Sequence, residues 1–219
     1  MKLLVQCNGR KKWRCFKNVC ENFSFSKEKE KFYQKKKKPQ WKMIEVELRS
    51  FISKEQYDSL LQFFQKYAAA KPPEQQTTYY FDGPHDLRIQ KNNAYSKVWL
   101  KKGALHDDAR EEIEIRCDTD AFENLERLFS ALGYGVAIKW FRQRHEFDWE
   151  GVSVCLDCTR GYGYIIEFEK LCEIDEKDSV LSLLHEKCKT LGIELSSKAE
   201  FEQKFRYYKE HWRTLTSDR

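Results

Sequence analysis

Short runs in which charged and apolar residues alternate are the feature of this sequence that most constrains its fold. In the segment MIEVELRSFI, residues 43–52, every second residue over the first part is apolar, and those between are Glu45, Glu47 and Arg49. A β-strand places side chains i and i+2 on the same face. The segment therefore predicts a strand with one apolar face and one charged face, a pattern that is also typical of a strand exposed to water on one side.

The same alternation recurs along the chain, and the sign of the charged face changes from strand to strand. We predict about eight strands, joined by hairpins and therefore mostly antiparallel. The charged members of these faces are Arg88; Lys97 and Lys101; Arg110, Glu112 and Glu114; Arg142, Arg144 and Glu146; Glu167 and Glu169.

Four amphipathic segments are predicted as helices, and each has an apolar stripe that needs a surface to cover. The apolar strand faces supply that surface, so the charged faces should look at one another inside. We therefore predict an α+β fold: an eight-stranded antiparallel β-barrel, or tunnel, with the helices packed outside. In the last helix we expect the stripe to be core packing. The helical segments are 53–67, 118–133, 176–192 and 196–212, and the last stripe is Phe201, Phe205, Tyr208 and Trp212.

The net charge of +5 is a property of the N-terminal 40 residues, which hold 13 basic and 3 acidic residues, against 27 basic and 32 acidic in the rest. We expect residues 1–40 to be a basic, disordered tail and residues 41–215 to form one domain. A second interpretation of the tail stays open: a binding segment for anionic surfaces, RNA or a nuclear import factor.

No apolar run reaches the roughly 20 residues of a membrane helix, and the first residues lack the apolar core of a secretory signal. We expect a cytoplasmic protein without membrane contact, monomeric or homodimeric. Its eight cysteines should then be reduced. Cys155 and Cys158 form one C-x-x-C, but a structural zinc site normally needs a second pair, so a metal or redox role for this pair is not our expectation.

A tunnel lined by acids on one wall and bases on another is a poor core but a good receptacle for a polyanion that carries a divalent metal. Arginine makes forked, charge-assisted contacts with phosphate oxygens. Clustered carboxylates repel one another unless a cation lies between them, and Mg²⁺ or Mn²⁺ prefers oxygen ligands. The pattern therefore predicts a triphosphate as the small-molecule substrate and Mg²⁺ or Mn²⁺ as the cofactor.

The motif IEVELR resembles the E-x-E-x-K/R signature of the CYTH family, the triphosphate tunnel metalloenzymes. The resemblance continues in order through YYFD, LRI, WLKKG, REEIEI, RQRHEF, VCLD and GYGYIIEFE, over roughly residues 43–205. The family includes class IV adenylate cyclases, thiamine triphosphatases and inorganic tripolyphosphatases. The resemblance implies an eight-stranded tunnel with helices outside.

The resemblance also implies roles for individual residues. The implied metal ligands are Glu45, Glu47, Asp157, Glu167 and Glu169, with Glu112 and Glu114 as a second acidic pair. The implied phosphate-binding residues are Arg49, Arg88, Lys101, Arg142, Arg144 and Lys198, to which we add Arg110. The residues expected to carry catalysis are Glu45, Glu47, Lys101, Glu167 and Glu169.

Two departures from the family pattern bear on the substrate. The family often shows L-R-x-R, whereas this chain has Gln90 at the second basic position, so we expect one phosphate contact fewer. The connection 83–86 is very short where other members have a longer piece that frames one tunnel mouth.

These features favour metal-dependent hydrolysis of a triphosphate, with inorganic tripolyphosphate, thiamine triphosphate and nucleoside triphosphates all open as substrates. Three alternatives stay open as well. They are a class IV-type adenylate cyclase that makes cyclic AMP from ATP, an RNA 5′-triphosphatase that uses the basic tail, and a non-catalytic phosphate-binding module.

Overall fold

The computed structural model describes residues 43–102 and 111–217, except for the side chains at 43, 101, 102, 111 and 112. The predicted tail, residues 1–40, lies outside the described residues. The strands are β1 (Met43–Ile52), β2 (Ala69–Ala70), β3 (Glu74–Phe81), β4 (Asp86–Lys91), β5 (Ser96–Lys102), β6 (Glu111–Cys117), β7 (Val136–Trp149), β8 (Val152–Thr159) and β9 (Gly163–Glu173). The α-helices are α2 (Lys54–Tyr67), α3 (Phe122–Ala131), α4 (Lys177–Thr190) and α5 (Lys198–Thr216).

All four predicted helices are present, and local sequence signals set their ends. The Ser53 hydroxyl accepts from the backbone of Gln56, whose side chain caps Ser53 in return, so the predicted capping box begins α2. Ser197 accepts from the backbone N–H of Glu200 at the start of α5. Short 3₁₀ turns, Thr119–Ala121 and Ile174–Glu176, precede α3 and α4.

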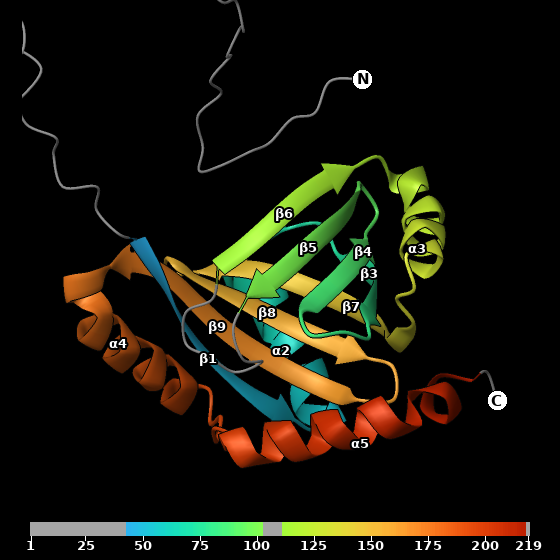
Figure 1. Cartoon of the computed structure of the whole chain (residues 1–219). Coiled ribbons are helices and arrows are strands. Elements are labelled where there is room, and N and C mark those ends of the chain that lie inside the picture. The colour runs from blue at the N-terminus through green and yellow to red at the C-terminus, as the bar shows by residue number, and fades with distance from the viewer. Residues whose placement is uncertain (1–42, 103–110, 218–219) are drawn as a thin grey trace, which may run out of the picture.

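The strands form one antiparallel sheet in the order β1-β9-β8-β7-β3-β4-β5-β6, with the two-residue β2 paired to β7. The sheet is strongly curled (Figure 1). The end strands β1 and β6 do not pair within the described part of the chain, so hydrogen bonds do not close the sheet. The predicted antiparallel sheet is confirmed, with the short β2 added to the eight strands of the main path. The closed barrel is not confirmed, because closure requires a ladder between those two edges.

Helices α2, α3 and α4 cover the apolar face of the sheet, as predicted. Phe64 of α2 and Leu184 of α4 are fully buried in one cluster with strand residues such as Val154 and Phe168. Phe122, which begins α3, packs on Ile89 in a second cluster. The clusters on this face hold most of the buried hydrophobic residues. Burial of each such side chain contributes about 1.5–3 kcal/mol.

Helix α5 is the exception to the prediction that all helices pack outside. Ile138 and Trp140 lie on the same face of β7 as the charged residues further along that strand. Tyr208 and Trp212 of α5 pack there, and their side chains donate to the backbone carbonyls of Lys139 and Ala137. The predicted aromatic stripe is core packing, but it covers one end of the charged face.

Gly161 in the β8–β9 turn tests this seating of α5. Its φ is +72°, and an added Cβ would lie 2.6 Å from Leu215 Cβ and 3.0 Å from the Leu215 carbonyl oxygen. Gly192 has a similar φ of +66° with nothing within 4 Å. We expect Gly192→Ala to lower the free energy of unfolding by roughly 1–2 kcal/mol through backbone strain alone, and Gly161→Ala by at least about 1 kcal/mol more through overpacking. Urea denaturation measures both, and equal losses would contradict the contact between α5 and the turn.

Candidate active site

The sheet register brings most of the predicted residues onto one face. Glu47 of β1 pairs with Glu169 of β9, and Arg49 pairs with Glu167. On β8 and β7, Asp157 pairs with Arg144. We call this surface the charged face; its described members on β1, β9, β8 and β7 are Glu45, Glu47, Arg49, Cys155, Asp157, Glu167, Glu169, Arg142, Arg144 and Glu146.

Four glutamates from β1 and β9 form the acidic part of the charged face. Glu167 is 9% exposed. Burial and the neighbouring charges of Glu167 and Glu45 raise the pKa of Glu169 to about 7. The pKa of Glu47 is also raised, by desolvation and by Glu167, although 38% of its side chain is exposed. These carboxylates therefore repel one another, and a cation between them would relieve the repulsion.

Asp157 connects the acidic part to two arginines. It is 1% exposed, and it accepts from Arg144 Nε at 2.8 Å, from Arg144 Nη2 at 2.6 Å and from Arg142 Nη1 at 2.9 Å. Arg144 Nη2 also contacts Glu167. Burial would lower the pKa of Arg144, but Glu167 and Asp157 outweigh it and raise the pKa. Arg144 therefore stays charged, at the boundary between acids and bases.

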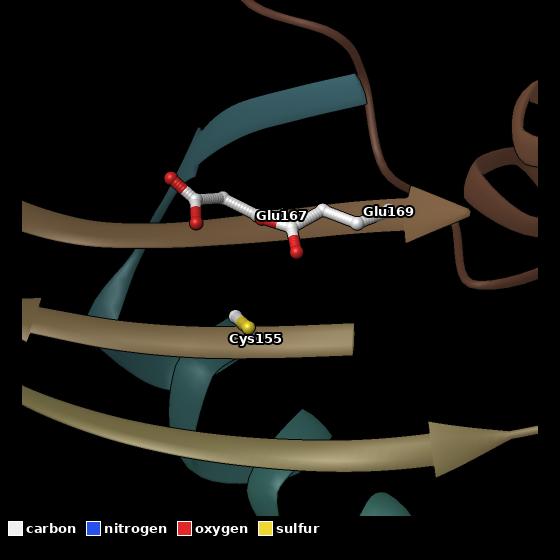
Figure 2. A group of neighbouring side chains, drawn as sticks. All are labelled: Cys155, Glu167 and Glu169. Carbon is white, nitrogen blue, oxygen red and sulfur yellow. The ribbon is translucent and has the colours of Figure 1, made fainter. Parts of the chain in front are cut away.

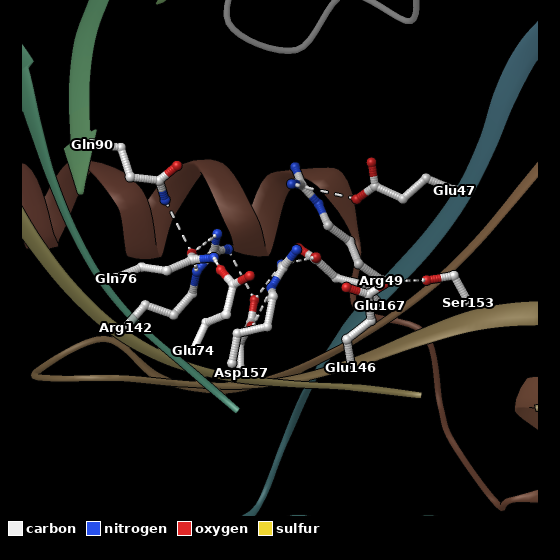
Figure 3. A network of polar contacts seen from close by, with 11 residues as sticks. Glu47, Arg49, Glu74, Gln76, Gln90, Arg142, Glu146, Ser153, Asp157 and Glu167 are labelled. Atoms are coloured by element: carbon white, nitrogen blue, oxygen red, sulfur yellow. Dashed lines mark hydrogen bonds and ion pairs between the residues drawn. The ribbon is translucent and has the colours of Figure 1, made fainter. Parts of the chain in front are cut away.

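Arg142 is held from its other side by an amide network (Figure 3). Gln76 Oε1 accepts from Arg142 Nε at 2.8 Å and Nη2 at 2.6 Å, and from Gln90 Nε2 at 3.1 Å. Gln76 Nε2 donates to Glu74 at 2.7 Å. Gln90, which replaces the second family arginine and is 7% exposed, thus belongs to a neutral scaffold that orients Arg142.

A cavity of about 270 Å³ opens beside Arg144, and its wall includes Lys71, Glu74, Asn92 and Glu146. Lys71 is ion-paired with Glu146. Gln76, Glu74 and Lys71 were absent from the sequence-predicted site. Glu74 and Gln76 occupy alternate positions of the strand EQQTTYYF, so they share one face. That alternation could have identified them, but neither residue belongs to a family motif and Gln76 is uncharged.

Two of the predicted residues on β4 to β6, Arg88 and Glu114, have charged partners on these strands. Asp86 makes two 2.6 Å contacts with the guanidinium of Arg88, which lies 4.3 Å from the ring centre of Tyr80. Glu114 accepts from Lys97 at 2.9 Å and from Arg116 at 2.7 Å. Burial would raise the pKa of Glu114, but these two hydrogen bonds lower it. A carboxylate that already has two cationic partners is a weaker candidate for a second metal.

The side chains of three other predicted residues lie outside the described part of the chain. The backbones of Lys101 and Glu112 pair across β5 and β6, but their side chains lie outside the described residues, as does all of Arg110. Lys198 begins α5 and is exposed, and among described residues no contact joins it to the charged face. Arg49 lies between the acids and α5, with its guanidinium 4.6 Å from the ring centre of Phe201.

The two cysteines of the C-x-x-C lie on opposite faces of β8. Cys155 is on the charged face, and its sulfur and carboxylate oxygens of Glu167 and Glu169 all lie within 4.8 Å of one another (Figure 2). Burial raises the pKa of the Cys155 thiol. Cys158 packs with the apolar core on the other side. The pair cannot share one metal ion, because residues three apart on a strand point in opposite directions.

The chain belongs to the CYTH domain family, because the family model matches residues 43–205, most of the chain. This confirms the resemblance carried by the ordered motifs. Among curated proteins, none matches the chain. Within the described residues, no helix is long and apolar enough to cross a membrane.

Three solved structures share the fold. A conserved hypothetical protein from Pyrococcus furiosus is 22% identical, with a TM-score of 0.56 over 68% of this chain and 91% of its own. A protein from Pyrococcus horikoshii OT3 is 25% identical, with a TM-score of 0.55 over 73% and 98%. An adenylyl cyclase-like protein from Hippeastrum, described as having a dominant triphosphatase activity, is 22% identical, with a TM-score of 0.54 over 80% and 100%.

The raised pKa of Glu169 predicts a pH dependence of stability in metal-free protein. The folded state keeps this proton up to about pH 7, whereas the unfolded chain loses it near pH 4.5, so the free energy of unfolding should fall as pH rises through that window. We expect Glu169→Gln to remove part of this fall and to stabilise the chelator-treated protein near pH 8 by of order 1–3 kcal/mol.

Denaturation curves from pH 4.5 to pH 8 in chelator measure this effect. Glu186→Gln, an exposed carboxylate on α4, is the matched control and should leave the profile unchanged. Identical profiles for wild type and Glu169→Gln would contradict the crowding of the carboxylates.

Proposed function

We propose that this chain hydrolyses a triphosphate with the help of a divalent cation, Mg²⁺ or Mn²⁺. The observation that carries the proposal is geometric: a cluster of carboxylates on β1 and β9 lies directly beside the Arg142–Arg144 pair on one face. A polyanion with a bound cation is the ligand that complements both parts at once.

The carboxylates fit a hard divalent cation. Glu47, Glu167 and Glu169 come from adjacent strands, and Glu45 lies on the same face of β1. Among the described residues, their ion-pair partners are Arg49, 3.8 Å from Glu47, and Arg144, in contact with Glu167. These glutamates would hold the ion, which when bound neutralises phosphate oxygens and makes a bound water more acidic.

The arginines would bind the phosphate chain. Arg144 uses Nε and Nη2 for Asp157 and Glu167, while its Nη1 has no hydrogen-bond partner among the described residues. That nitrogen is available to donate to a phosphate oxygen, and Arg144 lines the cavity described above. Asp157 is then a positioning residue, which holds both guanidinium planes in place.

Arg49 would extend this phosphate-binding set toward α5. The remaining predicted residues, Arg88, Lys101, Arg110, Glu112, Glu114 and Lys198, stay in the proposal as candidates for the far wall and the mouth. The Hippeastrum likeness supports triphosphate hydrolysis as the first activity to test and cyclic AMP formation as the second.

The decisive assay measures phosphate release from tripolyphosphate, thiamine triphosphate, ATP and a 5′-triphosphate RNA, with Mg²⁺ and with Mn²⁺. We expect metal-dependent release from at least one substrate. Glu47→Gln should lower kcat by roughly 10²–10³-fold, as loss of a charge-stabilising group does in other active sites, while Glu186→Gln should leave it unchanged.

No release from any of the four would overturn the hydrolase proposal. Cyclic AMP from ATP in the same reactions would then identify a cyclase, and tight binding of tripolyphosphate without turnover would identify a binding module.

A separate test addresses the phosphate-binding role of Arg144. Arg144→Lys keeps the positive charge but lacks the Nη1 donors. We expect KM for the best substrate to rise roughly 10–100-fold, the loss of about 1.5–3 kcal/mol of a charge-assisted hydrogen bond, with a smaller change in kcat. Steady-state kinetics measure this, with circular dichroism to confirm folding; an unchanged KM would remove Arg144 from the substrate-binding set.

A further inference from the structure

Cys155 places a sulfur atom among the carboxylates of the charged face. The residue is 1% exposed, and β8 holds it opposite Glu167 of β9 and Glu146 of β7. The sulfur and the oxygens of Glu167 and Glu169 lie within 4.8 Å of one another. This sulfur plays no part in the hydrolysis proposed above.

We propose that Cys155, Glu167 and Glu169 form a site for a thiophilic divalent ion, of the zinc or cadmium class. The inference rests on the proposed function only in that it shares two of its glutamates, and it concerns which metal that position binds.

The donor set fits such an ion. Zinc takes thiolate at about 2.3 Å and carboxylate oxygen at about 2.0–2.2 Å in tetrahedral geometry. Tetrahedral ligand atoms at those bond lengths lie about 3.5 Å apart. Side-chain rotations that move the ligand atoms by roughly 1 Å would therefore bring all three onto one ion. Soft thiolate ligands select zinc-like ions over magnesium, which prefers oxygen alone.

The surrounding contacts allow this rearrangement. Glu169 has no hydrogen bond or ion pair among the described residues, so its carboxylate can turn without breaking one. Glu167 contacts Arg144 through Oε2, which leaves Oε1 for an ion. As the metal–sulfur bond forms, the thiol proton passes to solvent, and the charge balance is kept without any oxidant or reductant.

The consequence is a difference in metal response. Zn²⁺ or Cd²⁺ would bind this position more tightly than Mg²⁺ and would compete with the ion that the glutamates hold for hydrolysis. Cys158, the second cysteine of the C-x-x-C, is not part of this ligand set, because it lies on the opposite face of β8.

The test titrates Cd²⁺ into the full, reduced, chelator-treated chain and follows sulfur-to-cadmium charge-transfer absorption. Cys155→Ser is the test variant, and Cys158→Ser, on the opposite face of the same strand, is the matched control. We expect Cys155→Ser to lose one tight, absorbing Cd²⁺ equivalent and Cys158→Ser to keep it.

Two further measurements separate ligation from a structural effect. Glu169→Gln should weaken this Cd²⁺ equivalent by roughly 10–100-fold while all sulfurs remain, because even outer-sphere partners of a metal cost that much. Cys155→Ser should leave Mg²⁺ affinity nearly unchanged, whereas a disrupted fold would weaken both metals. Circular dichroism checks folding, and Cys155→Ala provides a second variant without the Cys155 thiol.

An unchanged Cd²⁺ signal in both Cys155 variants would overturn the inference, as would an equal loss in Cys158→Ser. The readout contains no substrate, so its outcome is independent of hydrolysis. A chain that binds Cd²⁺ through Cys155 but releases no phosphate would refute the proposed function and leave this inference standing.

Discussion

The ion pairs of Asp157 with Arg142 and Arg144 are the interaction on which the rest of the candidate site depends. A carboxylate that is 1% exposed is stable only when its charge is compensated, and removing one partner of such a pair typically costs about 3–5 kcal/mol. The same pairs fix the two guanidinium planes between the acidic strands β1 and β9 and the neutral amide network of Gln76 and Gln90. The position of both halves of the site therefore depends on one buried side chain of β8.

The fold provides this arrangement because one face of the sheet is apolar and covered by helices, whereas the other carries the charged residues. Three helices bury the apolar face and supply most of the core, so the opposite face is free to carry charge. Helix α5 covers one end of the charged face, because Tyr208 and Trp212 pack on Ile138 and the neighbouring aromatic residues.

Strand positions, helix positions and the charged face were predictable from the sequence, because side-chain alternation and capping signals are local. The register, which the period-two pattern strongly constrains, then brought Glu47, Glu169, Asp157 and Arg144 together. Sheet closure was not predictable in this way, since it depends on how far the whole sheet curls. The seating of α5 was missed for a related reason: an aromatic stripe specifies that a helix is buried, but not against which face.

Residues that act through uncharged or indirect contacts were harder to find. The side-chain carbonyl oxygen of Gln76 accepts from Arg142. Gln76 is uncharged and belongs to no motif, so the sequence does not identify it as a site residue. Arg88 matched a phosphate-binding motif, but Asp86, only two residues away, accepts two hydrogen bonds from its guanidinium. Cys155 was seen only as half of a C-x-x-C, and its place among carboxylates became visible only once β8 was paired with β9.

The most direct test of this account is whether the glutamates hold a divalent cation at all. The electron paramagnetic resonance signal of free Mn²⁺, followed during titration of the chelator-treated chain, counts the bound ions without any substrate. The account predicts saturable Mn²⁺ binding that Glu186→Gln retains and the double variant Glu47→Gln/Glu169→Gln loses. Absence of saturable binding, or equal binding by the double variant, would contradict it.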